Sequence, residues 1–307
     1  MIRKQALAGL LLVVNTAYSD PVRIASWNLN NLHHLSGEAL RPRAPVRVDE
    51  DFAVLRQYVH RLHADVVALQ EVNGPKAAQR LFPESEYELY FSGRYEADLE
   101  SARVSDRIYT GFAVRKNVFD RIVKVDNAAL SVLHGKSRRP TRRGVELRVE
   151  RYGRVLYLLN LHLKSGCFRG NLLRPGNENC RTLARQIEPL ETWIDERTRE
   201  SVPFIVLGDF NRAFDVYDEN DHLWLALDDG NPAGLELFRL PDGEASTCWR
   251  NTGLYHRNPV DFFVLNKVAL PQLIAGSFTR FGYDSGHRDK KRRTPSDHCP
   301  VLIEYGL

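Results

Sequence analysis

The sequence predicts an α/β protein in which mixed β-sheets pack as a sandwich with helices against them, and three observations support this class. Residues 22–72 contain a strand, a helix and a second strand in succession, a unit that makes parallel neighbours with a covering helix. Residues 144–163 have the pattern of a β-hairpin, which adds antiparallel pairing. Residues 203–208 form a short apolar run between Pro203 and Gly208, typical of a strand buried on both faces.

The remaining elements follow from the same kinds of pattern. The first strand is broken at Asn30-Asn31, and the first helix, Asp49–Leu62, has apolar residues at helical spacing with Asp49 as its expected N-cap. Arg181–Arg199 is strongly amphipathic and predicts a second long helix. A short helix is expected at His222–Leu227. Strands are expected at Val22–Leu29, Asp65–Val72, Tyr87–Phe91, Thr110–Arg115, Arg121–Val125, Gly144–Glu150, Val155–Leu163, Val260–Leu265 and Pro300–Tyr305.

The first 19 residues have the pattern of a signal peptide. Arg3 and Lys4 precede an apolar run over residues 6–14, and small residues follow at Ala17 and Ser19. The run is too short to span a bilayer as a permanent helix. We expect cleavage after Ser19, which N-terminal sequencing checks, and a secreted or periplasmic monomer without stable membrane insertion. No repeat or Pro/Gly/Ser linker divides residues 20–307, so one domain is predicted.

Basic residues are clustered, although the overall charge is small. Two of the 43 Lys and Arg lie in residues 1–19, which leaves 41 against 39 acidic residues and says nothing about partners. A cluster of this kind is usually a solvated loop, but two clusters beside polar motifs favour contact with phosphate groups. The clusters are Lys136, Arg138, Arg139, Arg142 and Arg143, and Arg288, Lys290, Lys291, Arg292 and Arg293.

Four cysteines in an exported chain predict two disulfides. Three pairings are possible. Cys167 with Cys180 is favoured because the two residues bracket one polar loop, and Cys248 with Cys299 because that bond joins two late segments. The spacing of zinc-binding cysteines is absent from the sequence.

Polar side chains follow apolar runs at six places. One such place, Gly208-Asp209-Phe210-Asn211, is as typical of a turn as of a pair that orients water. Six of them predict a polar site collected at the strand ends of an apolar sheet. The residues are Asn28, Glu71, Asn160 with His162, Asp209 with Asn211, Asp261, and Asp297 with His298.

The residue types in this set indicate metal-assisted chemistry. Carboxylates and amides without cysteine suit a hard cation, Mg²⁺ or Mn²⁺. Glu71 is the first expected ligand, with Asn28 and Asp297 beside it. Two histidines remain for proton transfer and charge stabilisation. An Asp–His pair next to a metal carboxylate is suited to hydrolysis of a phosphate ester by water.

In these motifs the chain resembles the endonuclease/exonuclease/phosphatase superfamily, over nearly all of residues 22–305 and in the family's order. The resemblance implies a deoxyribonuclease I-like fold, a four-layer sandwich of two packed mixed β-sheets flanked by helices. The motifs are Ser-Trp-Asn-Leu at 26–29, Leu-Gln-Glu-Val at 69–72, Asn-Leu-His-Leu-Lys-Ser at 160–165, Gly-Asp-Phe-Asn at 208–211, Val-Asp-Phe-Phe at 260–263 and Ser-Asp-His-Cys-Pro-Val at 296–301.

The resemblance also implies roles for these residues. Asn28, Glu71 and Asp297 would form the metal site. Asp209 would position and help to deprotonate the attacking water, and Asn211 would hold that water or the phosphate. His298, oriented by Asp261, would contact the phosphate or act as base, and His162 would lie near the leaving group.

Three positions depart from the family pattern or leave alternatives open. Asn30 stands where abasic-site enzymes tend to carry an acid. The acid that orients the second histidine in deoxyribonucleases has no clear match, and Asp106 is the nearest candidate. An arginine that grips phosphate corresponds to Arg142 or Arg143, of which Arg143 is preferred.

The basic clusters favour nucleic acid as the substrate. A lipid substrate would need an exposed apolar hairpin, and the sequence shows no contiguous apolar loop with paired aromatics. We therefore expect a Mg²⁺-dependent nuclease that cuts DNA with little sequence preference. The alternatives are a sphingomyelinase-like or other phosphate-ester hydrolase, and a catalytically silent binding module. Retention of every expected acid and histidine speaks against the silent module.

Overall fold

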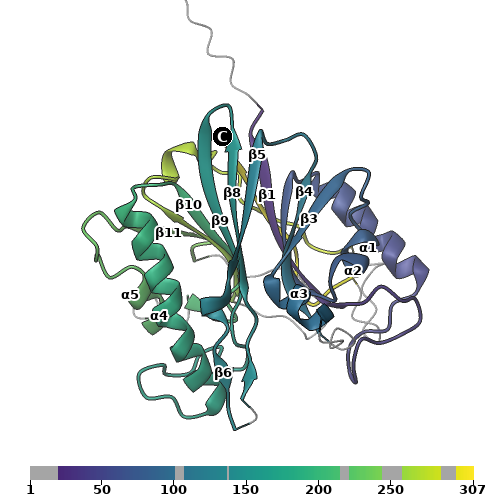
Figure 1. The fold of residues 1–307 in the computed structure, drawn as a ribbon, viewed down its shortest axis with the longest axis horizontal. Helices are drawn as coiled ribbons and strands as arrows, with labels where there is room; N and C mark the ends of the chain where they lie inside the picture. The colour runs from purple at the N-terminus through teal and green to yellow at the C-terminus, as the bar shows by residue number, and fades with distance from the viewer. Residues whose placement is uncertain (1–19, 101–106, 137, 215–220, 244–257, 285–294) are drawn as a thin grey trace, which may run out of the picture.

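Two six-stranded mixed sheets packed face to face form the centre of the protein, and helices lie on their outer surfaces (Figure 1). The computed structural model describes residues 20–100, 107–136, 138–214, 221–243, 258–284 and 295–307. The predicted α/β class and the four-layer arrangement are both confirmed. Residues 1–19 lie outside the described part, so the signal peptide stays a prediction. Within the described part, no helix has the length and apolar character needed to cross a bilayer.

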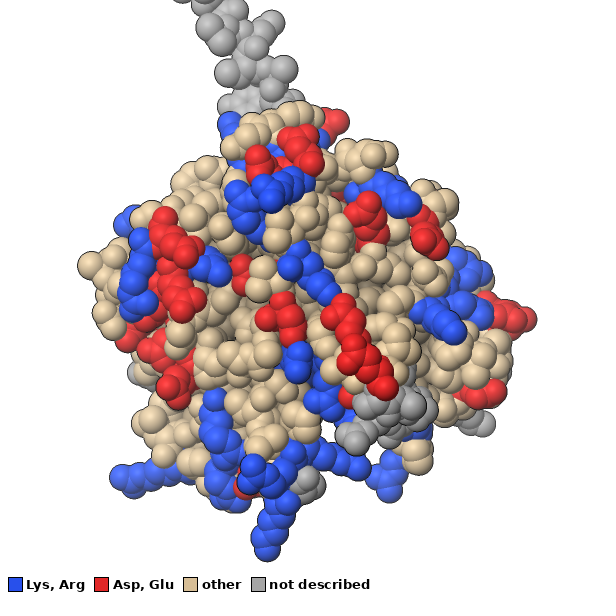
Figure 2. Space-filling model, viewed as in Figure 1, with Lys and Arg blue, Asp and Glu red and all other residues tan. Residues whose placement is uncertain are grey.

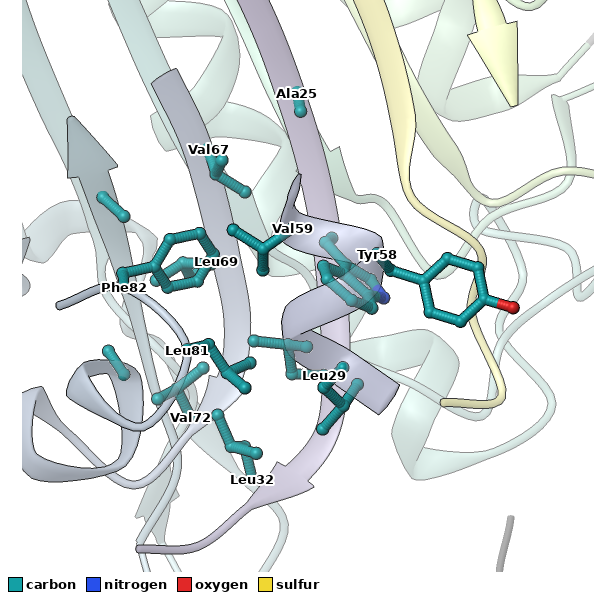
Figure 3. Close-up of a cluster of buried hydrophobic side chains, with 14 of the residues drawn as sticks. Ala25, Leu29, Leu32, Tyr58, Val59, Val67, Leu69, Val72, Leu81 and Phe82 are labelled. Atoms are coloured by element: carbon teal, nitrogen blue, oxygen red, sulfur yellow. The ribbon is translucent and has the colours of Figure 1, made fainter. Parts of the chain in front are cut away.

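The first sheet has the strand order β13-β14-β1-β2-β4-β3. Its strands are β1 (Val22–Leu32), β2 (Val66–Val72), β3 (Tyr87–Phe91), β4 (Tyr109–Arg115), β13 (Thr279–Arg280) and β14 (Val301–Tyr305), and the helices that follow them are α1 (Asp49–Leu62), α2 (Pro75–Gln79) and α3 (Gly93–Glu100). β1 is parallel to β2 and antiparallel to β14. Figure 3 shows the outer core of this half, where Val59 of α1 and Phe82 belong to one buried cluster with Leu69 of β2.

The second sheet has the order β11-β12-β10-β9-β8-β5. Its strands are β5 (Arg121–Asn127), β8 (Gly144–Arg151), β9 (Arg154–His162), β10 (Phe204–Asp209), β11 (Leu237–Leu240) and β12 (Asp261–Asn266). The helices α4 (Glu178–Arg199) and α5 (His222–Leu227) cover its outer face (Figure 1). A short ribbon of β6 (Leu133–His134) and β7 (Arg139–Pro140) projects from one end.

In the strands that build the site, the side chains that face the other sheet change from apolar to polar toward one end. In β10, Ile205 and Leu207 belong to the core between the sheets, and the next residue of that parity is Asp209. Since alternate residues of a strand share a face, the side chain of Asp209 lies on the same inner face as Ile205 and Leu207. The same change takes place from Ile24 to Asn28, from Val66 to Gln70, from Leu156 to His162 and, in the antiparallel β12, from Leu265 to Asp261. The interface is therefore apolar at one end and polar at the other.

Buried amides join the two sheets where this change takes place. Asn160 of β9 is fully buried and donates to the carbonyls of Leu69 and Gly111 in the opposite sheet, at 3.0 and 2.6 Å. Its Oδ1 accepts from Nε2 of Gln70 at 2.8 Å. A buried polar group is costly when it is unpaired, and these bonds satisfy both atoms of the Asn160 amide and the Nε2 of Gln70.

The structure corrects several predicted boundaries: α4 begins at Glu178 rather than Arg181, β5 continues to Asn127, and β1 and α1 also differ. β1 continues to Leu32 through a register shift at Asn30 and Asn31, which have φ of 45° and 57°. The predicted break is therefore a bulge within the strand. The N-cap of α1 is Val48 rather than Asp49, because Asp51 Oδ2 reaches back to accept from the Val48 amide at 2.9 Å.

The loop after β9 is closed by the predicted Cys167–Cys180 disulfide, which the structure confirms. Cys299 is also disulfide-bonded, and its predicted partner Cys248 lies outside the described residues. Arg212 also fixes this loop, because its guanidinium donates to the carbonyls of Cys167 and Gly170, at 2.9 and 2.7 Å. The same group pairs with Asp221 at 2.7 Å, and both side chains are at most 1 % exposed.

We expect Arg212→Ala to lower the free energy of unfolding by about 3–5 kcal/mol, because removal of one partner leaves Asp221 buried and uncompensated. Urea unfolding followed by circular dichroism measures this change. The control is Lys267→Ala, which breaks an exposed pair with Glu236 and should cost less than about 1 kcal/mol. Equal losses for the two variants would contradict a structural role for the buried pair.

Candidate functional site

The predicted polar residues meet at one end of the sheet interface. β1, β2, β9 and β10 all end there, and β12, which is antiparallel to β10, begins there. Asp209 is level with His162 of β9 on one side and with Asp261 of β12 on the other. The segment that carries Asp297 and His298 enters β14, which is antiparallel to β1. Topology thus brings together residues that are far apart in the chain.

Asp209 is the centre of the cluster and is 1 % exposed. Its Oδ2 accepts from Nδ2 of Asn28 at 3.0 Å and its Oδ1 from the amide of Asn211 at 2.8 Å. Nε2 of His162 and Nε2 of His298 lie 3.4 and 3.9 Å from Oδ2. Burial raises the pKa of Asp209 to about 7, against the opposing charge of His298 and the two hydrogen bonds. Asp209 is therefore poised to exchange a proton near neutral pH.

The backbone around Asp209 explains why the motif resembles a turn. The strand ends at Asp209, and Asn211 has a φ of 51° with its amide bonded to the Asp209 carboxylate. Gly208 has a φ of 133°, and a Cβ there would lie 2.1 Å from the carbonyl oxygen of Leu161. A glycine is thus required for β9 and β10 to approach this closely. The motif is a turn as well as part of the site.

His298 and Asp261 form a hydrogen-bonded pair, with Nδ1 of His298 2.8 Å from Asp261 Oδ2. The amide of His298 donates to Ser296 Oγ, which in turn donates to the carbonyl of Asn28 at 2.7 Å. Burial alone would lower the pKa of His298, but the Asp261 and Asp209 carboxylates outweigh burial and raise it well above 6.5. The imidazole is therefore protonated at neutral pH.

His162 is in the opposite state. Burial, followed by the charges of Arg142 and His298, holds its pKa well below 6.5. Its Nε2 lies 3.8 Å from Glu71 Oε1, and its buried Nδ1 has no hydrogen-bond partner among the described residues. Asp106, the acid considered for orienting it, lies outside the described part. The two histidines flank Asp209 as one neutral and one charged group.

Glu71 is held at the end of β2 with an unusual φ of 58°. Its Oε2 accepts from both the amide and the Nδ2 of Asn31, at 3.1 and 2.8 Å. The described residues offer no hydrogen bond to Oε1 of Glu71 or to the Asp297 carboxylate, so these acceptors can take a ligand. Both amide atoms of Asn28 bond to protein, since its Oδ1 accepts from the Asn30 amide. Asn28 thus orients Asp209.

The two candidate phosphate-gripping arginines have different positions. Arg143 pairs with Asp126 at 2.6 Å, so its charge is already matched. Arg142 makes no ion pair with a described residue, and the charges of Glu71 and Asp209 act on it while burial lowers its pKa. The geometry therefore favours Arg142, contrary to the preference for Arg143 drawn from the sequence. The side chains of neighbouring residues in an extended segment point to opposite sides. A shift of one residue in this segment would therefore decide which of the two arginines faces the site.

Several residues near the site were not predicted. Asn31 orients Glu71, and Lys164 and Arg41 act electrostatically on His162. Arg47 is buried and donates to the carbonyls of Leu29, Asn30 and Pro295, between 3.0 and 3.1 Å. It thereby joins the end of β1 to the segment that carries Asp297. Burial lowers its pKa to about 10 despite the carboxylate of Asp297.

The model of the endonuclease/exonuclease/phosphatase family matches residues 25–298. The chain belongs to this family. A search among proteins with curated annotation finds no match. Solved structures share the fold at low identity. D. rerio TDP2 complexed with single strand DNA product has a TM-score of 0.59 and 18% identity, covering 94% of this chain and 100% of that one.

Two further structures show the range of the fold. The human Nocturnin catalytic domain with bound sulfate anion has a TM-score of 0.56 and 17% identity, covering 93% of each chain. A Bacteroides thetaiotaomicron mannosyl-6-phosphatase has the same TM-score and identity, covering 93% of this chain and 100% of its own. At this level of identity the similarity shows the fold alone, so the substrate must be argued from the residues of the site.

This member of the family has a cluster that could hold a divalent metal. Ligand atoms of Asp209, Asp261 and His298 lie within 4.8 Å of one another. The hydrogen bond between His298 and Asp261 already engages two of the three groups. Beside Glu71, Asn31 Oδ1 is a buried oxygen without a partner among the described residues. Oxygen acceptors of this kind suit a hard cation, so the site as a whole fits a metal.

The pKa shifts predict how stability depends on pH in the metal-free protein. The folded state holds the His298 proton more tightly than the unfolded chain, so its contribution is full below pH 6.5 and is lost as the pH rises through the folded-state pKa. Asp209 acts in the same direction between pH 3.8 and about 7, because its raised pKa keeps a proton on the folded state. We expect the free energy of unfolding to fall as the pH rises above 6.5.

Urea unfolding in EDTA at several pH values measures this slope. Asp261→Asn should flatten it above pH 6.5, because the carboxylate that raises the pKa of His298 is gone. The exposed Glu84→Gln serves as the control and should keep the wild-type slope. A slope that Asp261→Asn leaves unchanged would rule out this pair as its source.

Proposed function

We propose that the protein is an exported Mg²⁺- or Mn²⁺-dependent phosphodiesterase that hydrolyses nucleic acid, DNA in particular, with low sequence specificity. One observation carries the hydrolytic part of this proposal: a buried carboxylate, Asp209, lies between a neutral His162 and a protonated His298. When the surroundings of two titratable groups shift their pKa values apart, one group can act as the acid and the other as the base.

In this proposal, water attacks the phosphorus and gives a proton to Asp209, whose raised pKa suits a general base. Asn211 holds the water or a phosphate oxygen. As the phosphorus–oxygen ester bond breaks, the His298 imidazolium gives its proton to the leaving oxygen, and Asp261 stabilises the charge and orientation of that ring. Arg142 offsets negative charge that develops on the phosphate. His162 stays neutral and contacts the leaving group or the phosphate.

Glu71 and Asp297 would hold the metal, with Asn28 oriented beside them. When bound, the cation supplies Lewis-acid polarisation of a phosphate oxygen. The support is the pair of carboxylates with unengaged oxygens, together with the buried Asn31 Oδ1 next to Glu71. Asp209, Asp261 and His298 are the other group that could take a cation, but in this proposal their hydrogen bonds assign them to proton transfer.

The preference for nucleic acid rests on charge. Lys and Arg gather at the lower end of the face in Figure 2, where β6 lies in Figure 1. The related TDP2 structure, named as a complex with single strand DNA product, is consistent with such a substrate. The related mannosyl-6-phosphatase makes a sugar phosphate the main competing substrate. Arg288–Arg293, the second basic cluster, lies outside the described residues.

The test is hydrolysis by purified protein with Mg²⁺ of plasmid DNA, RNA, mannose 6-phosphate and sphingomyelin vesicles. We expect nicking of DNA that EDTA abolishes, and losses of about 10²–10⁴-fold in rate for His298→Ala and for Asp209→Asn. Arg121→Ala, an exposed change in β5, is the control and should keep the wild-type rate. Cleavage of lipid or sugar phosphate without DNA nicking would overturn the substrate, and no hydrolysis of any substrate would favour a silent binding module.

A further inference from the structure

A second pocket lies beside the catalytic cluster and shares Arg142 with it. The cavity has a volume of about 390 Å³. Segments from four parts of the chain line it: the loop before α1, α3 with the start of β4, the β6–β7 ribbon, and the loop after β9. Its basic side chains are Arg41, Arg94, Arg107, Arg139, Arg142 and Lys164.

The described residues of the pocket do not balance its positive charge. Asp98 is the one carboxylate among the lining residues, and Arg94 at 2.9 Å and Arg107 at 3.9 Å already share it. The hydroxyl of Tyr109 also donates to Asp98, at 3.1 Å. Arg41, Arg139 and Arg142 form no ion pair with a described residue. Like charges brought together in a concave site repel one another unless an anion joins them.

Arg142 fixes the position of this pocket relative to the reaction. Its charge acts on Glu71, Asp209 and His162, while its side chain also lines the pocket. Lys164, only two residues after His162 at the end of β9, also lines the pocket and acts on the same histidine. An anion bound here would therefore lie next to the phosphate that is cleaved.

The opposite flank of the site has a different character. A cavity of about 120 Å³ on the side of His298 has apolar walls, including Phe168 and Pro259, and contains the acids Asp261 and Asp297 with a single arginine, Arg280. Among the described lining residues, the two flanks thus differ in charge, and the excess of cations is on the flank beside Arg142. A substrate that fits both flanks carries its additional negative charge on one side of the cleaved bond.

We propose that the basic pocket binds a second phosphate group of the substrate, adjacent to the phosphodiester that is hydrolysed. This inference rests on the proposed function and narrows its substrate class to molecules with at least two phosphates, such as oligonucleotides or nucleotides with a terminal phosphate. Guanidinium groups bind phosphate oxygens through paired, charge-assisted hydrogen bonds. An isolated phosphodiester or a sugar monophosphate would leave the pocket unused.

The experiment compares the dithymidine phosphodiester TpT with pTpT, TpTp and the trinucleotide TpTpT, in Mg²⁺, with products separated by anion exchange. We expect at least one substrate with a second phosphate to have a KM about tenfold or more below that of TpT, the effect of one or two charge-assisted bonds. A preference for pTpT or TpTp identifies a terminal monoester, and a preference confined to TpTpT a backbone diester. In Arg41→Ala/Arg139→Ala this preference should disappear, whereas Arg121→Ala should keep it.

Two outcomes overturn the inference. One is equal KM values for all four compounds; the other is a double variant in which the KM for TpT rises by the same factor as the KM for the other compounds. Thermal unfolding of the double variant detects a loss of fold. If no compound is hydrolysed, the proposed function fails, but calorimetric titration of TpT and TpTpT in EDTA still tests the pocket. Tighter binding of the compound with two phosphates by wild type, lost in the double variant, supports it, and equal binding contradicts it.

Discussion

The site depends on the alternation of side chains along strands that share one buried interface. The two sheets pack because Ile24, Ile205, Leu207 and their neighbours form a dry layer between them. Residues of the same parity further along these strands must face the same interface, so Asn28 and Asp209 meet across it. A slip of one residue in β10 would exchange Asp209 with its apolar neighbours and destroy core and site together. The register that builds the core therefore also aims the side chains of the candidate site.

Burial then sets the protonation of these groups. A carboxylate removed from water resists ionisation, and a histidine removed from water resists protonation. Asp209 follows this rule, and so does His162 beside Arg142. His298 departs from it because the Asp261 carboxylate lies within hydrogen-bond distance. The positive φ of Glu71 and Asn211 is a further cost at the same place, and strain of this kind concentrates where groups must be aimed at a ligand.

Much of this arrangement was predictable from the sequence, and the limits have physical causes. Apolar runs that end in Asn, Glu, Asp or His gave the strands and the site residues, because strand ends of an α/β sheet collect such groups. The sequence favoured Arg143 and the geometry favours Arg142, since the choice depends on one residue of register. Asn31 and Arg47 carry no local signal: their roles come from contacts with Glu71 and with the carbonyl of Pro295, which is 248 positions from Arg47. The basic pocket was predicted only in part: Arg139 and Arg142 belong to the first basic cluster of the sequence, whereas its other basic residues come from distant parts of the chain.

Gly208 shows how a residue without a functional group can limit what the site tolerates. Any side chain there would collide with the Leu161 carbonyl, and relief of that collision would move β9 away from β10 and so His162 away from Asp209. A mutational library could therefore vary the substrate-facing loops widely while this position stays invariant. For redesign of the enzyme, specificity is open to change in the pocket walls, whereas the spacing of the two strands is not.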